Sequence, residues 1–183
     1  MKILSIIGSL RKGSHNRRIY EYYQAMAAGR AELVEGSYAD FPLYDDDLRK
    51  ENPPASVLRL ADELRGADGV LFFSPEYNYS VPGPLKNAID WMSKLPDQPF
   101  AAKPAAILSA SPGNSAGARM QYHLRQIGVF LDLRFLNKPE IMIPQVHKKL
   151  DDDGKLVDEG TRERLEAHLE AFLRFADAER VAT

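Results

Sequence analysis

The feature of this sequence that most restricts its fold is a series of short apolar runs separated by stretches with helical periodicity. The most apolar runs are residues 3–7, 69–74 and 105–110. Each run is too short for a helix and lacks the alternation of a half-exposed strand, so each predicts a strand buried on both faces. Between the runs, apolar residues recur three and four positions apart, as in amphipathic helices. This alternation predicts an α/β domain whose parallel sheet is covered by helices on both faces.

The remaining elements complete one domain over residues 1–183, because no repeat, low-complexity tract or long linker interrupts the chain. Residues 45–47 and 151–154 are predicted to form a loop and a turn. Further strands are predicted at residues 33–37 and 141–143, with Phe135 preceding the last of them. Helices are predicted at residues 14–28, 53–64, 82–92, 116–131 and 161–176.

Composition excludes several classes of function. The formal net charge is -2, which gives no general attraction for nucleic acid or for an anionic membrane. The chain has no cysteine, so disulfides, thiol catalysis and thiolate metal sites are excluded. The run from Asp151 to Gly154 is similar to the start of a calcium loop, but its twelfth position is Arg162 instead of glutamate. We therefore predict no metal site.

The sequence also predicts a soluble, cytoplasmic protein. No apolar stretch approaches the roughly 20 residues that cross a bilayer. The first apolar run is followed by Arg11 and Lys12, whereas the basic residues of a signal peptide precede its apolar segment.

In open parallel sheets, ligands bind beyond the carboxyl ends of the strands. The first loop there, GSLRKGSHN at residues 8–16, leaves a buried strand and enters a helix, so free backbone N–H groups converge in it. Ser9, Ser14, Asn16 and the Arg11 guanidinium add hydrogen-bond donors and charge, as a phosphate requires. The spacing matches neither a Walker sequence nor the G-x-G-x-x-G fingerprint. These residues alone fit a phosphate site and a simple helix cap equally well.

A second loop, PEYNYSVPGP at residues 75–84, follows the most apolar strand. With Tyr77 and Asn78 inside a proline-bracketed segment, it offers backbone N–H groups and an aromatic wall for a flat ring. Its composition also fits a stiff turn that ends a strand and starts a helix.

GSLRKGSHN together with PEYNYSVPGPLKNAIDW resembles the NADPH-dependent FMN reductase family of flavodoxin-like flavoproteins, especially its quinone and chromate reductase branch. LPDQP, GARMQYHLRQ and NKPE add to the resemblance, which runs from Ile3 to about Phe172. It implies a flavodoxin-like α/β fold with a five-stranded parallel sheet of order 2-1-3-4-5. It also implies one FMN-binding domain that takes electrons from NADPH or NADH.

The resemblance implies a cofactor site made by three loops, with no metal. His15 is expected to face solvent or to pack in the first loop, and not to act as a base. Ser9, Arg11, Gly13, Ser14, His15 and Asn16 would surround the phosphate, Pro75, Glu76, Tyr77 and Asn78 would line the ribityl chain and the isoalloxazine edge, and Ser111 and Gly113 would close the opposite side of the ring.

The same resemblance implies a reaction carried by FMN and by no catalytic side chain. Hydride would pass from the nicotinamide to flavin N5 and then to a quinone, chromate, an azo compound or free flavin. One open ring face shared by donor and acceptor implies ping-pong kinetics. Two alternatives are a flavodoxin-type single-electron carrier, disfavoured because such carriers are strongly acidic, and a flavin-binding module without catalysis.

The helix predicted at residues 116–131 carries a second apolar face, since Tyr122 and Val129 lie opposite its main stripe. Such a helix is often buried once in the core and once against a partner. The resemblance implies a homodimer or homotetramer, and we expect cross-subunit contacts from Arg119, Tyr122 and Glu140. Trp91 is expected to contribute likewise. The alternative is that these are isolated surface apolar residues.

Overall fold

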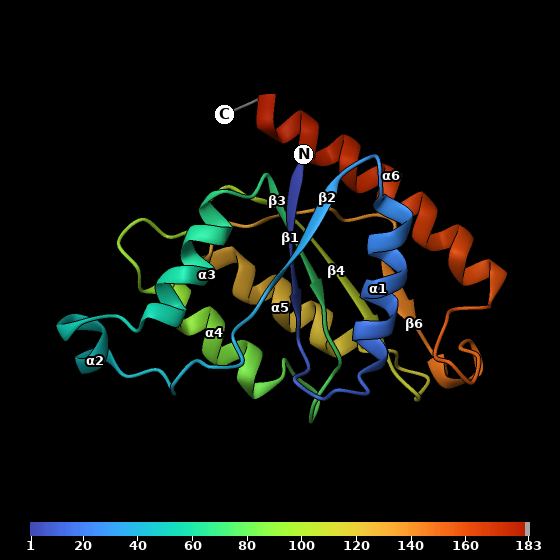
Figure 1. Cartoon of the computed structure of the whole chain (residues 1–183), viewed down its shortest axis with the longest axis horizontal. Coiled ribbons are helices and arrows are strands. Elements are labelled where there is room, and N and C mark those ends of the chain that lie inside the picture. Colours follow the sequence, from blue (N-terminus) through green and yellow to red (C-terminus); the bar gives the residue numbers. More distant parts are fainter. Residues whose placement is uncertain (182–183) are drawn as a thin grey trace.

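The structure, a computed structural model, describes residues 1–181. Within them the chain forms a six-stranded parallel sheet, in which β2-β1-β3-β4-β5 are neighbours in that order and β6 also pairs with β4 (Figure 1). The strands are β1 (Lys2–Ile7), β2 (Glu32–Gly36), β3 (Gly69–Phe73), β4 (Pro104–Ala110), β5 (Arg134–Phe135) and β6 (Ile141–Ile143). The predicted parallel sheet and its order are confirmed.

Helices cover both faces of this sheet. Figure 1 shows α1 and α6 on one side of the strands and α3 and α4 on the other. The side chains of α5 pack in the same core as those of α3 and α4. The helices are α1 (His15–Ala27), α2 (Asp46–Glu51), α3 (Ala55–Arg65), α4 (Gly83–Ser93), α5 (Ala118–Phe130) and α6 (Glu159–Val181), with a short 3-10 helix at Val146–Lys148.

Each face of the sheet carries its own hydrophobic core, because successive strand residues point to opposite faces. In β3, Phe72 packs into the core beneath α3, α4 and α5, whereas Phe73 packs into the core beneath α1 and α6. All five residues of β3 and all seven of β4 are buried. This double burial explains why both strands are continuous apolar runs in the sequence.

The outer edge of β4 is paired by two short strands instead of one. β5 pairs with Pro104 and Ala105, and β6 pairs with residues 108–110 further along the same edge. Residues 136–140, which connect β5 to β6, belong to neither strand. The predicted fifth strand is therefore present as two segments, in keeping with the separate apolar signals at Phe135 and residues 141–143.

Two predictions about individual segments are wrong. The acidic run at residues 45–47 starts α2, since the Asp45 carboxylate accepts hydrogen bonds from the N–H groups of Asp47 and Leu48 and caps the helix. Trp91 is not available to a partner, because it is fully buried within the chain. Its indole N–H donates to the Pro42 carbonyl at 2.9 Å.

Within residues 1–181, no helix is long and apolar enough to cross a bilayer.

The core beneath α1 and α6 contains a buried histidine. The Nδ1 atom of His168 lies 2.7 Å from the Tyr23 hydroxyl, and its ring stacks on Phe172 with 6.4 Å between centroids. Burial lowers the pKa of His168 to about 3, because the charged imidazolium would lose its hydration. His168 therefore stays neutral in the folded protein, whereas in the unfolded chain it titrates near pH 6.5.

This difference predicts acid sensitivity. As the pH falls below about 6.5, the unfolded chain binds a proton that the folded chain does not, so stability falls as the pH falls. We expect His168 to add a slope of up to about 1.4 kcal/mol per pH unit between roughly pH 6 and pH 4. Urea unfolding at a series of pH values should show this slope in the wild type and lose it in His168→Gln. The control His123→Gln, at an exposed site, should retain it; equal slopes in wild type and His168→Gln would contradict the assignment.

Candidate functional site

The first loop begins where β1 and β3 end side by side. Gly8 donates its N–H to the Phe73 carbonyl at 2.9 Å. A Cβ at Gly8 would lie 2.2 Å from Ser74 Oγ, so this close approach requires glycine. Ser14 is the N-cap of α1, and its side chain accepts from the N–H of Arg17. The positive end of the α1 dipole therefore lies at the carboxyl edge of the sheet.

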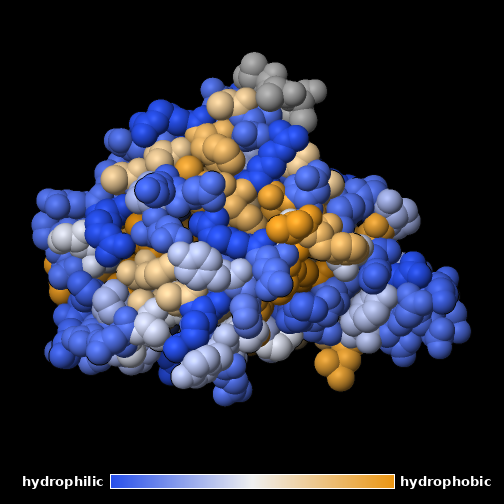
Figure 2. All heavy atoms as spheres, turned by 180° about the vertical axis from the view of Figure 1, so that it is seen from behind, coloured by the Kyte–Doolittle hydropathy of each residue, from blue (hydrophilic) through white to orange (hydrophobic). Residues whose placement is uncertain are grey.

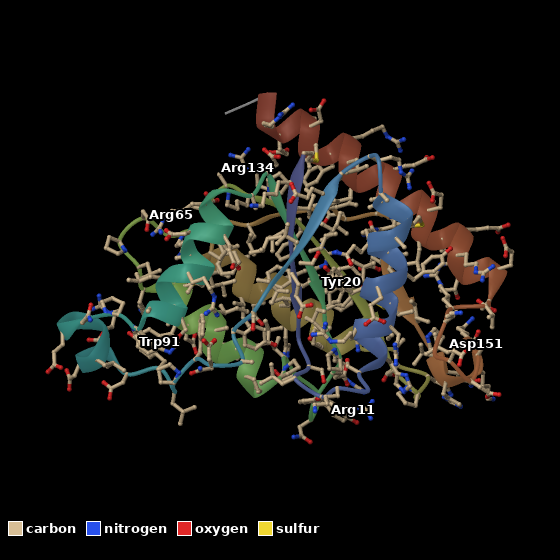
Figure 3. All side chains as sticks on the ribbon, in the orientation of Figure 1. Arg11, Tyr20, Arg65, Trp91, Arg134 and Asp151 are labelled. Atoms are coloured by element: carbon tan, nitrogen blue, oxygen red, sulfur yellow. The ribbon has the colours of Figure 1, made fainter. Side chains whose placement is uncertain are left out.

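Arg11 supplies a full positive charge to this loop. It lies at the edge of the sheet where β1 ends (Figure 3). Its guanidinium lies over the Gly13 backbone, since a Cβ at Gly13 would be 3.8 Å from Nη1. No carboxylate among residues 1–181 forms an ion pair with it. An unpaired guanidinium beside a helix N-terminus favours an anion.

The second loop is a tight reversal. Tyr77 and Ser80 exchange both backbone hydrogen bonds at 3.0 Å, and the two residues between them, Asn78 and Tyr79, have φ values of 49° and 69°. This left-handed conformation is costly for a residue such as Tyr79, and such conformations concentrate at functional sites. Tyr77 also reaches the first loop, because its hydroxyl lies 3.1 Å from Ser9 Oγ.

Glu76 fixes the second loop to α5. Its side chain is only 9% exposed, and Oε1 lies 2.6 Å from the Arg119 guanidinium. The other carboxylate oxygen accepts from the N–H of Met120 in the first turn of α5. The Arg119 guanidinium in turn lies 3.7 Å from the centroid of the Tyr79 ring. One ion pair and one cation–π contact thus hold the turn in place.

The third loop, residues 111–117, follows β4 and is tied to α1. The buried Asn16 side chain donates from Nδ2 to the Ala110 carbonyl at 3.0 Å and accepts on Oδ1 from the Ala110 N–H at 2.9 Å. Asn16 thereby joins the first helix to the end of β4. Its predicted contact with a phosphate stays a prediction.

The three loops enclose a cavity of about 310 Å³, at the small end of the range typical of ligand sites. Its lining contains nine of the predicted cofactor residues, together with Ala110 and Pro112, which flank the predicted Ser111 and carry no chemical signal of their own.

 The full lining is Ser9, Arg11, Ser14, His15, Asn16, Pro75, Glu76, Tyr77, Ala110, Ser111 and Pro112.

Three predicted cofactor residues lie outside this lining. Gly13 lies beneath the Arg11 guanidinium, and Asn78 is exposed in the second loop. The Gly113 carbonyl accepts from Ser111 Oγ at 3.1 Å, so Gly113 contacts a residue that lines the cavity. Roles for these three residues in cofactor binding stay predictions.

The electrostatics of the cavity favour an anion at its first-loop end. Burial lowers the pKa of His15, and the nearby charges of Arg11 and His147 lower it further. A bound anion beside His15 would oppose this shift. At the other end of the cavity, the Glu76 carboxylate is neutralised by Arg119.

Two of the residues predicted at an interface, Arg119 and Tyr122, belong to α5, and the third, Glu140, directly precedes β6. Tyr122 and Val129 are 58% and 82% exposed, as expected for a second apolar face of this helix. Seen from behind, the molecule carries hydrophobic patches among hydrophilic residues (Figure 2). Arg119 is engaged within the chain by Glu76, and Glu140 is partly exposed. Their cross-subunit contacts stay predictions.

Comparison with known proteins identifies the family. Residues 1–148 match the NADPH-dependent FMN reductase family. The chain belongs to this family. The match includes all three loops of the cavity, so the predicted family and the predicted class of enzyme are confirmed.

Individual relatives are similar over almost their whole length. A quinone reductase of Escherichia coli K12 is 49% identical over 178 residues, which cover 96% of this chain and 95% of the relative. An NAD(P)H-dependent FMN reductase of Pseudomonas aeruginosa is 45% identical, covering 94% of this chain and 93% of the relative. These proteins extend the family match beyond residue 148.

Solved structures confirm the flavodoxin-like fold. The flavoenzyme NAD(P)H:(acceptor) oxidoreductase FerB of Paracoccus denitrificans is 35% identical, with a TM-score of 0.88 over 97% of this chain and 98% of that one. A flavodoxin variant from Pseudomonas aeruginosa has a TM-score of 0.58 at 16% identity, covering 95% of this chain and 99% of that one. The second likeness concerns the fold alone.

Proposed function

We propose that this protein is an FMN-dependent NAD(P)H oxidoreductase that reduces quinones and similar small acceptors. The observation that carries the proposal is the cavity at the carboxyl ends of β1, β3 and β4, whose lining includes Arg11, a cation with no ion-pair partner among the described residues 1–181. Membership of the FMN reductase family supports the cofactor. The name of the relative in Escherichia coli, a quinone reductase, supports the acceptor.

The residues of the first loop fit the phosphate of FMN. Ser9 and Ser14 offer hydroxyl groups, Arg11 offers a fixed positive charge, and the start of α1 offers free backbone N–H groups. Gly13, His15 and Asn16 complete the loop around them. This donor set matches the chemistry of a phosphate dianion and gives little to a neutral ligand.

The other two loops fit a flat ring. Pro75, Glu76, Tyr77 and Asn78 would lie along one side, and Ser111 and Gly113 along the other. When bound, FMN supplies the hydride chemistry that no side chain of this protein can perform. The protein binds and orients the ring and limits the access of water to it.

The cavity offers little for acid–base catalysis by side chains. Its one carboxylate, Glu76, is paired with Arg119. His15 lies in the first loop, at the end that we assign to the phosphate. This arrangement supports a reaction that depends on the cofactor and on the orientation of donor and acceptor.

A direct assay tests the proposed function. The purified protein should release FMN on denaturation and oxidise NADH or NADPH with benzoquinone or free FMN as acceptor. Because donor and acceptor would use one ring face in turn, double-reciprocal plots should be parallel. Intersecting plots would contradict the shared face. FMN release without nicotinamide oxidation would favour an electron carrier or a binding module instead.

A matched pair of variants tests the phosphate assignment. Arg11→Gln should weaken FMN binding about 10- to 100-fold, because a hydrogen bond to a charged group contributes about 1.5–3 kcal/mol. Arg18→Gln is the control, since Arg18 also lies near the start of α1 but pairs with Glu21 at 3.2 Å. Titration of the apoprotein by flavin fluorescence should show little change for the control. Equal losses in both variants would contradict a specific role for Arg11.

A further inference from the structure

A buried polar network lies behind the third loop. The side chain of Gln121 in α5 is fully buried. Its Nε2 donates to Ser109 Oγ at 2.8 Å and to the Ile141 carbonyl at 2.7 Å. Ser109 belongs to β4 and Ile141 to β6, so one amide joins a helix to two neighbouring strands.

Ser109 connects this polar network to the third loop. Its hydroxyl donates to the Ala116 carbonyl at 2.5 Å. Ala116 and the following Gly117 have φ values of 50° and 84°, so the chain reverses sharply before α5. A Cβ at Gly117 would lie 2.8 Å from Ser109 Cβ, which shows that this reversal packs directly on Ser109.

The other end of the loop is held independently. Asn16 holds Ala110 through both atoms of its amide. Ser111 donates its N–H to the Ile143 carbonyl and accepts from the N–H of Val146, each at 3.1 Å. The segment between these anchors includes Ser111 and Pro112, which line the cavity.

Gln121 is a costly residue for simple packing. Its Oε1 atom is buried and has no hydrogen-bond partner among residues 1–181. A buried polar atom without a partner destabilises a fold, and an apolar side chain of similar size would avoid that cost. The amide is therefore better explained by the two bonds that its nitrogen makes than by the space that it fills.

We propose that Gln121 is a positioning residue that holds the third loop against the flavin ring. It does so through Ser109, which fixes the reversal at Ala116, and through Ile141, which keeps β6 beside β4. The proposal rests on the function proposed above, because it assigns the loop to the ring. Gln121 itself does not line the cavity and touches no reacting atom.

The first test needs no cofactor. Gln121→Met and Ser109→Ala each remove part of the network, and Gln24→Met is the control, since Gln24 donates to the Leu33 carbonyl at 2.8 Å in another part of the chain. In the apoprotein, hydrogen exchange of residues 111–118 should accelerate about tenfold in the first two variants, as expected for loss of a hydrogen bond. The control should leave these amides unchanged. No acceleration, or a uniform acceleration across the sheet, would overturn the proposal.

The second test uses the FMN-loaded enzyme. In Gln121→Met the absorption spectrum of bound FMN should shift, and kcat/KM for benzoquinone should fall about tenfold, because a displaced wall misorients the reactants. An unchanged spectrum and unchanged kcat/KM would overturn the link to the ring. If Gln121→Met does not fold, Ser109→Ala decides both tests. If the wild type binds no FMN, the proposed function fails, whereas the exchange test still decides whether Gln121 fixes the loop.

Discussion

The site depends on one geometric constraint, which is that three neighbouring parallel strands end at the same edge of the sheet. Ile7 at the end of β1 is paired with Phe73 of β3, and Phe73 with Leu108 of β4. Burial of these strands on both faces fixes their register, because a shift by one residue would move every side chain of the strand into the opposite core. The three loops that follow are brought together by this register. Gly8 then permits the close contact between the first two of them.

Polar contacts turn the three neighbouring loops into a preformed cavity. The Ser9–Tyr77 contact joins the first loop to the second, the Glu76–Arg119 pair joins the second to α5, and Asn16 and Gln121 hold the segment around the end of β4. Each of these bonds joins groups within the protein and so restricts the loops, and a restricted site loses less conformational entropy on binding. Arg11, in contrast, has no ion-pair partner among residues 1–181. The contacts that hold the three loops lie within the protein, whereas the cation at the rim of the cavity is available to an anion.

The sequence predicted the features that depend on local pattern. Continuous apolar runs identified β1, β3 and β4, and the resemblance supplied the order of the strands. Features that depend on tertiary partners were missed. The cap that starts α2 looks like a solvated acidic loop, and the burial of Trp91 depends on the distant Pro42 carbonyl. Gln121 was not predicted either, because its partners lie 12 and 20 residues away along the chain.

The central claim is that the first loop binds the cofactor through its phosphate. Calorimetry of the apoprotein with FMN and with riboflavin, which lacks the phosphate, tests this most directly. Several charge-assisted hydrogen bonds, each contributing about 1.5–3 kcal/mol, predict that FMN binds about 100-fold or more tightly than riboflavin. Equal affinity for the two flavins would contradict the account.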